Sequence, residues 1–303
     1  MTLPTVQPTT DTLVTGGAEL TFDVRRNEAS SKLPLLLVGS PMGAGGFGTL
    51  AGHFADRTVI TYDPRGTERS RRTDDRIENT PQEHADDMRR LLEHLRLGPV
   101  DLFASSGGAV NALELTVRHP DLLRTVVAHE PPLVRYLPDA EVAEKVTRDM
   151  HADYQANGIG GAMAKFISLV SHEGELTDGY LARPAPDPSM FGLPTEDDGS
   201  RDDALLGRNL LTCTLHELDL EALRGVVRGG AAAEGRPRLV LAAGAESRGQ
   251  LARRATEALA ERLGAEVVDF PSDHGGFLGG EYGQRGDPDA FAAKLREVLN
   301  GAV

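Results

Sequence analysis

The sequence predicts an α/β protein with a mainly parallel sheet and helices on both faces. Apolar strand-like segments alternate with amphipathic helix-like segments through short connections, which is typical of a parallel sheet. Several of the strand-like segments are almost unbroken apolar runs, as expected for strands covered on both sides. The chain of 303 residues, 40% apolar and 26% charged, is long enough for one large domain with a sizeable core.

The individual elements follow from local patterns. Residues 12–15 and 18–25 are expected to form a hairpin, because Gly16-Gly17 suits a tight turn. Thr80 and Pro81 have the residue types favoured at the N-cap and first position of a helix. Further strands are expected at 33–38, 58–62, 100–104, 125–129, 238–243 and 265–270. Helices are expected at 49–55, 80–95, 109–117, 140–156, 162–171, 203–211, 251–263 and 289–299.

The regular alternation lapses between residues 133 and 225. That segment has helical patches and a stretch rich in Pro, Asp and Gly from 183 to 201. We therefore expect a helical cap at 133–225, inserted between two parts of one α/β core, residues 1–132 and 226–303.

Composition excludes several classes of function. A net charge of −14 disfavours nucleic acid and anionic membranes as partners, because both would be repelled. Cys213 is the only cysteine, so neither a disulfide framework nor a thiolate metal cage is expected. The first residues lack the pattern of a signal peptide, and no apolar run reaches the length of a membrane helix. A cytoplasmic protein acting on a small molecule is expected; the oligomeric state is not predicted.

A turn around Ser106 carries the first functional signal. The apolar strand 100–104 is followed at once by a helical pattern, with Ala104-Ser-Ser106-Gly-Gly108 between them. A strand that reverses this sharply into a helix strains its middle residue and needs small neighbours two positions away on each side. The turn would project the Ser106 hydroxyl and aim the first helical amides at a bound group.

Polar residues follow several of the expected strands. In open parallel sheets, ligands bind beyond the carboxyl ends of the strands. Candidate residues at such ends are Ser40, Ser106, Glu130, Glu246 and His274. Serine needs an adjacent base to become a nucleophile, and histidine has the suitable pKa. His274, between Asp273 and Gly275-Gly276 after the last strand, is the best-placed candidate base.

The turn at Ser106 and the Asp273-His-Gly-Gly-Phe277 segment together resemble the α/β-hydrolase superfamily, over roughly residues 18–300. Gly39-Ser-Pro is similar to that family's His-Gly-x-Pro loop, and Asp63-Pro-Arg-Gly66 to its Asp-x-Arg-Gly turn. Two positions depart from the family pattern. Val38 replaces the usual His, and Glu68 replaces a Gly after the Arg-Gly pair.

The resemblance implies a triad with Ser106 as nucleophile and His274 as base. The acid is expected to be Glu246, in the turn where the family usually has an Asp, with Glu130 as the second candidate because a few relatives place the acid after the preceding strand. The amides of Gly107 and Ser40 are the expected oxyanion donors.

The expected function is hydrolysis of an ester-like substrate, such as an ester, lactone or thioester, without a cofactor or a metal. Candidate pocket residues are Met42, Met163, Phe166, Met190 and Phe191. The same site could instead perform acyl transfer, lyase or cyclisation chemistry, or the fold could be an inactive binding protein. A further alternative is a dinucleotide-binding oxidoreductase, because residues 43–48 match G-x-G-x-x-G and Asp63 follows twenty residues after Gly43.

Overall fold

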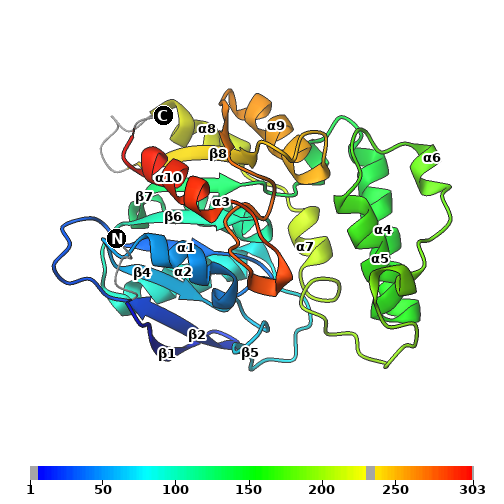
Figure 1. The fold of residues 1–303 in the computed structure, drawn as a ribbon, viewed down its shortest axis with the longest axis horizontal. Coiled ribbons are helices and arrows are strands. Elements are labelled where there is room, and N and C mark those ends of the chain that lie inside the picture. Colours follow the sequence, from blue (N-terminus) through cyan, green and yellow to red (C-terminus); the bar gives the residue numbers. More distant parts are fainter. Residues whose placement is uncertain (1–5, 230–235, 302–303) are drawn as a thin grey trace.

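A computed structural model describes residues 6–229 and 236–301 of the chain, and a single sheet dominates it (Figure 1). Within these residues the sheet has nine strands in the order β1-β2-β4-β3-β6-β7-β8-β9, with β5 beside β2. The strands are β1 (Thr9–Thr15), β2 (Ala18–Arg25), β3 (Leu35–Val38), β4 (Val59–Tyr62), β5 (Arg71–Arg72), β6 (Val100–Ser105), β7 (Leu123–His129), β8 (Arg238–Gly244) and β9 (Val267–Phe270).

Strands β4, β3, β6, β7, β8 and β9 run parallel, whereas β1 and β2 form an antiparallel hairpin at one edge. Gly17, at φ 84°, makes the hairpin turn, as its position in the sequence predicts. The predicted fold class is confirmed. The carboxyl ends of the six parallel strands all lie at the same end of the sheet, so the segments that follow the strands lie side by side.

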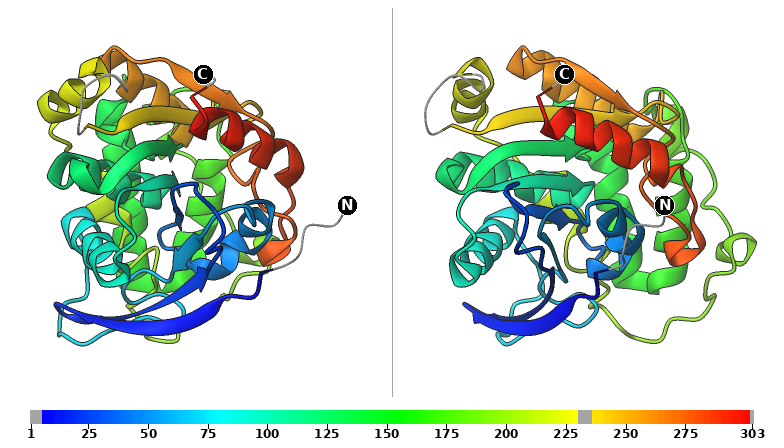
Figure 2. Two further views of the ribbon diagram at one scale, coloured as in Figure 1. Left: turned by 90° about the vertical axis from the view of Figure 1, so that its left-hand side faces the viewer. Right: turned by 60° about the vertical axis from the view of Figure 1, so that its left-hand side comes forward.

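Helices cover both faces of the sheet (Figure 2). They are α1 (Gly48–His53), α2 (Pro81–Leu95), α3 (Gly107–Arg118), α8 (Leu220–Gly229), α9 (Leu251–Leu263) and α10 (Pro288–Leu299). Side chains of β3 alternate between the faces: Leu36 packs in the cluster with Met88 of α2, and Leu37 packs in the cluster with Phe291 of α10. The sequence pattern missed α8.

Helix α2 begins as the sequence predicts. The Thr80 hydroxyl accepts a hydrogen bond from the Glu83 amide at 3.2 Å, and the Glu83 carboxylate accepts one from the Thr80 amide at 3.0 Å. This reciprocal capping box satisfies amides that the first helical turn leaves free. None of the described helices combines the length and the apolar character needed to cross a membrane.

A separate group of helices lies beyond one end of the sheet (Figure 1). Its helices are α4 (Ala140–Asn157), α5 (Ile159–Val170), α6 (Asp178–Leu181) and α7 (Leu210–Thr214), with their own apolar cluster. The predicted helix 203–211 is wrong in extent, because the chain forms a wide turn there: the Arg208 and Leu210 amides donate to the Asp203 and Leu205 carbonyls, five residues earlier. Inside the range predicted as cap, Leu218 and Leu223 pack in the core cluster of the sheet.

Candidate active site

The turn between β6 and α3 has the geometry that its small residues predict. Ser106 has φ 58° and ψ −129°, a strained conformation for a residue with a side chain. Its amide donates a hydrogen bond to the His129 carbonyl at 2.9 Å, which ties the turn to the end of β7. An added Cβ at Gly108 would lie 2.8 Å from the Gly39 Cα atom, so the chain can pass here only as glycine.

Ser40 lies directly beside the start of α3. Strands β3 and β6 pair through Val38 and Ala104, which brings the segments after them together. An added Cβ at Gly107 would lie 2.5 Å from the Ser40 carbonyl oxygen. The Ser40 hydroxyl is buried and has no hydrogen-bond partner among the described residues. The structure therefore brings the two predicted oxyanion residues together next to Ser106.

The Nδ1 atom of His274 hydrogen-bonds to Oε2 of Glu130. Glu130 follows β7 with φ 50°, and its side chain is only 1% exposed. Its other oxygen accepts a hydrogen bond from the Gly244 amide at 2.9 Å. Both carboxylate oxygens thus have donors, which fixes the orientation of the group.

The electrostatics of this pair follow from burial and mutual attraction. Burial alone would raise the pKa of Glu130, but the His274 hydrogen bond, the His274 charge and the Gly244 amide outweigh it and lower that pKa to about 2. Burial likewise works to lower the pKa of His274, and the contact with Glu130 outweighs it, so that this pKa is raised. Glu130 is therefore ionised near neutral pH, and Nδ1 of His274 carries the proton that it donates.

Glu246, the acid expected first, occupies a different place. Its side chain is exposed in the turn after β8, and its amide donates to the Ser272 carbonyl at 2.9 Å. The structure pairs His274 with Glu130, the second candidate, instead of Glu246. The physical reason is that the Gly244 amide, at the end of β8, donates to Glu130.

His129 is a site neighbour that sequence reasoning missed. It is fully buried at the end of β7, its Nδ1 atom lies 3.2 Å from the Ser105 hydroxyl, and its ring centroid lies 6.0 Å from that of His274. Burial lowers the pKa of His129 to about 4, so its imidazole is neutral near neutral pH. Its position directly before Glu130 was the available signal.

His129, Glu130 and His274 offer possible metal ligands within 4.8 Å of one another. His129 and Glu130 are closed to solvent, and both oxygens of Glu130 already accept hydrogen bonds. A metal ion bound here would have to displace those bonds. The arrangement is better suited to holding a proton than to ligating a metal.

The predicted pocket residues are dispersed. Met42 packs against the glycine-rich loop, residues 43–48, where its Sδ atom lies 2.3 Å from the position of an added Cβ at Gly46. Met163 and Phe166 pack against the apolar cluster of the cap helices. Met190 is 80% exposed and Phe191 is 38% exposed, so both side chains contact solvent.

A cap residue outside the predicted set reaches the site. The Sγ atom of Cys213, on α7, lies 3.1 Å from the position of an added Cβ at Gly107. His216, two residues beyond α7, is hydrogen-bonded to Glu114 of α3 at 3.1 Å. Helix α7 and the residues after it therefore contact α3 directly beside the Ser106 turn.

The glycine-rich loop does not have the arrangement of a dinucleotide site. Its first glycine is followed by a four-residue 3₁₀ segment, η1 (Ala44–Phe47), and the six-residue α1 begins only at Gly48. The Ala44 amide donates to Asp63 at 2.8 Å, and an added Cβ at Gly43 would lie 2.5 Å from the same carboxylate. The Asp63 carboxylate thus occupies the space beside Gly43 that a pyrophosphate would need, and its negative charge would repel the pyrophosphate.

Comparison with known proteins agrees with this geometry. Residues 35–157 match the alpha/beta hydrolase fold family. The chain is 32% identical over 270 residues to the uncharacterized hydrolase YraK of Bacillus subtilis (strain 168), covering 88% of this chain and 89% of the relative. The structure is similar to MGS-M2, an α/β-hydrolase enzyme from a Medee basin deep-sea metagenome library (TM-score 0.67, 14% identity, 96% and 97% of the two chains). It is also similar to the enol-lactonase from Burkholderia xenovorans LB400 (TM-score 0.64, 15% identity, 96% and 100% of the two chains). With its parallel sheet, strained serine turn and histidine loop, the chain belongs to the α/β-hydrolase family.

Proposed function

We propose that the protein is a serine hydrolase that cleaves an ester-like small molecule through an acyl-enzyme. The observation that carries the proposal is the hydrogen bond between Glu130 and His274, at the sheet edge where the strained Ser106 turn also lies. Glu130 orients the imidazole, which leaves Nε2 as the nitrogen that can accept a proton.

The reaction would proceed in two balanced steps. His274 Nε2 takes the Ser106 hydroxyl proton while Oγ attacks the carbonyl carbon, and the resulting oxyanion accepts hydrogen bonds from the Gly107 and Ser40 amides. Collapse of this intermediate expels the leaving alcohol, which receives the proton from His274. A water molecule then gives a proton to His274 and attacks the acyl carbon. Collapse of this second intermediate releases the acid, and His274 passes the proton to Ser106 Oγ, which restores both residues.

The substrate class is an uncharged ester, lactone or thioester. The net charge of −14 disfavours polyanionic substrates. The similarity to a solved enol-lactonase supports including a cyclic ester in the first panel of substrates. Acyl transfer, lyase or cyclisation chemistry at the same site is the second candidate. Product analysis in isotope-labelled water separates them, since only hydrolysis puts solvent oxygen into the acid product.

Labelling with a fluorophosphonate probe, followed by mapping of the modified peptide, tests the proposal. We expect a single adduct on Ser106, lost in Ser106→Ala and nearly lost in His274→Ala. His53→Ala serves as the matched histidine control, because His53 lies at the end of α1 beside Asp289. An absence of adduct on the folded wild-type protein, or an adduct that persists in Ser106→Ala, would contradict the assignment.

A further inference from the structure

Glu68 and Tyr282 form a hydrogen bond that joins two loops, the segment after β4 and the segment after β9. The Tyr282 hydroxyl donates to Glu68 Oε1 at 2.6 Å, across 214 positions of the chain. Glu68 has φ 46° and Tyr282 has φ 53°. Residues other than glycine rarely adopt this left-handed backbone conformation, and they keep it only where the surrounding structure holds them there. Both partners of one contact are thus held in strained backbone.

The Glu68–Tyr282 pair lies on the glycine-rich loop. The Gly43 amide donates to Glu68 Oε1 at 3.4 Å, the same oxygen that binds Tyr282. An added Cβ at Gly46 would lie 3.1 Å from the Tyr282 ring, so the ring rests directly on the loop backbone. These contacts explain why the loop is built from glycines.

Two more carboxylates hold the same loop. Asp63 accepts from the Ala44 amide at 2.8 Å, and Glu281 accepts from the Thr49 amide at 2.8 Å. The acids come from the segments after β4 and β9. Acidic side chains of the protein therefore bind the start of the loop at Gly43 and Ala44, and the start of α1 directly after it at Thr49.

The position of this loop is coupled to Ser40. The chain makes a tight turn between Gly39 and Met42: an added Cβ at Gly39 would lie 2.6 Å from the Met42 carbonyl oxygen. Ser40 lies inside this tight turn, and Gly43 follows it immediately. A shift of Gly43 would therefore move the Ser40 amide relative to Gly107.

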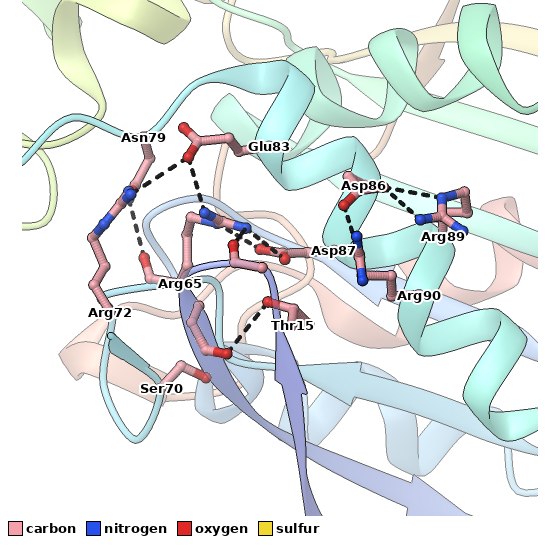
Figure 3. Close-up of polar contacts among 12 residues, drawn as sticks. Thr15, Arg65, Ser70, Arg72, Asn79, Glu83, Asp86, Asp87, Arg89 and Arg90 are labelled. Carbon is pink, nitrogen blue, oxygen red and sulfur yellow. Dashed lines mark hydrogen bonds and ion pairs between the residues drawn. The ribbon is translucent and has the colours of Figure 1, made fainter. Parts of the chain in front are cut away.

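The segment that carries Glu68 is rigidly anchored. Arg65, three residues earlier, is buried between two acids of α2 (Figure 3). Its guanidinium contacts both oxygens of Asp87 at 2.7 Å and one oxygen of Glu83 at 3.0 Å. Asn79 in turn donates to the Arg65 carbonyl at 3.0 Å. The backbone three residues before Glu68 is thus anchored to α2 through Arg65.

We propose that Glu68 and Tyr282 are positioning residues, which hold the glycine-rich loop so that the Ser40 amide stays aimed at the developing oxyanion. The inference rests on the proposed serine hydrolase activity. It also accounts for an oddity of the sequence: Glu68 stands where the family it resembles has glycine, at a backbone angle that favours glycine.

Two single variants and their combination test the pair, with a p-nitrophenyl ester as substrate. Tyr282→Phe removes only the hydroxyl, and Glu68→Gly removes both hydrogen bonds while relieving the backbone strain. For each we expect kcat to fall about tenfold with KM changed less than about twofold, because the lost alignment matters only once the oxyanion forms. Binding of a boronic acid, which forms a tetrahedral serine adduct, should weaken by a similar factor. The double variant should lose no more than Glu68→Gly alone.

Stability measurements separate positioning from a merely structural role. Glu68→Gly should keep its Tm within a few degrees of wild type, because relief of strain offsets the lost contacts. Tyr180→Phe, which removes the same atom in the cap, is the matched control with unchanged kcat. Unchanged kcat in Tyr282→Phe, or a fall in kcat matched by a loss of folded protein, would overturn the inference. Wild-type protein that neither turns over the ester nor labels at Ser106 would instead refute the proposed function.

Discussion

Glu130 and His274 meet beyond the end of the sheet although 144 positions separate them in the chain. Glu130 follows β7, one strand away from the Ser106 turn at the end of β6, and the Gly244 amide at the end of β8 binds its second oxygen. The segments after β7 and β9, together with the end of β8 between them, thus build one carboxylate–imidazole pair. A carboxylate with donors on both oxygens cannot rotate freely, so it fixes the ring of its partner.

Substitution of Glu130 and of Glu246 should have opposite effects on kcat. Glu130→Gln should lower kcat by about 10³–10⁴, because the amide no longer fixes the histidine tautomer or stabilises the imidazolium. Glu246→Gln should leave kcat close to wild type, because its side chain is exposed in the turn after β8. Steady-state ester hydrolysis measures both. A large loss in Glu246→Gln with little change in Glu130→Gln would restore the order that the sequence suggests.

Hydrolysis should depend on pH through His274. The base must be neutral, and contact with Glu130 raises its pKa above the ordinary 6.5. The acid limb of kcat/KM should therefore lie above pH 6.5, with activity rising as pH rises. In Glu130→Gln, burial acts without the compensating charge, so the limb should move to lower pH as the rate falls. An unmoved limb would mean that another group titrates in the profile.

Glycines at the Ser106 turn should tolerate no side chain. In Gly108→Ala the new methyl group would meet backbone atoms of Val38 and Gly39 at 2.6–2.8 Å, and we expect a loss of about 1–3 kcal/mol in unfolding free energy. Gly52→Ala is the matched control. It lies in α1 with nothing within 4 Å of an added Cβ, and should be neutral or stabilising by about 0.5–1 kcal/mol. Urea denaturation compares the two; equal effects would refute the packing argument.

His129 should make stability depend on pH. Its pKa is about 4 in the folded protein against 6.5 ordinarily, so the unfolded chain binds a proton in this range that the folded one does not. Stability should therefore fall as pH falls from 6.5 to 4, by up to about 3 kcal/mol from this group. Denaturation of His129→Gln at pH 7.5 and pH 4.5 should show a smaller difference than wild type. An equal difference would mean that His129 is not the group responsible.

Much of the fold follows from the sequence because its signals are local. The apolar runs locate the parallel strands, and Thr80-Pro81 locates the start of α2. The Ser106 turn follows in the same way, since small residues are needed within two positions of the serine. The helix predicted at 203–211 fails because the Arg208 and Leu210 amides bond to carbonyls five residues earlier instead of four, a departure that periodicity does not register.

The acid was harder to predict because its choice depends on relations between strands. Glu130 and Glu246 both follow a parallel strand, and the carboxylate of either could orient a histidine. They differ in features that depend on the folded chain: Glu130 is buried, has a left-handed backbone and binds the Gly244 amide, whereas Glu246 is exposed. The Glu68–Tyr282 contact was hidden for the same reason, because nothing local joins residues 214 positions apart.

The central placement of β3, β6 and β7 limits how the protein can change its substrates by mutation. These strands carry Ser40, Ser106 and Glu130 at their ends, and each has a hydrogen-bonded neighbour on both sides. A substitution that displaced one strand end would disturb the others as well as the core. New specificities are therefore more accessible through the cap and the connecting loops, which can vary in length and side chains while the reactive groups keep their places.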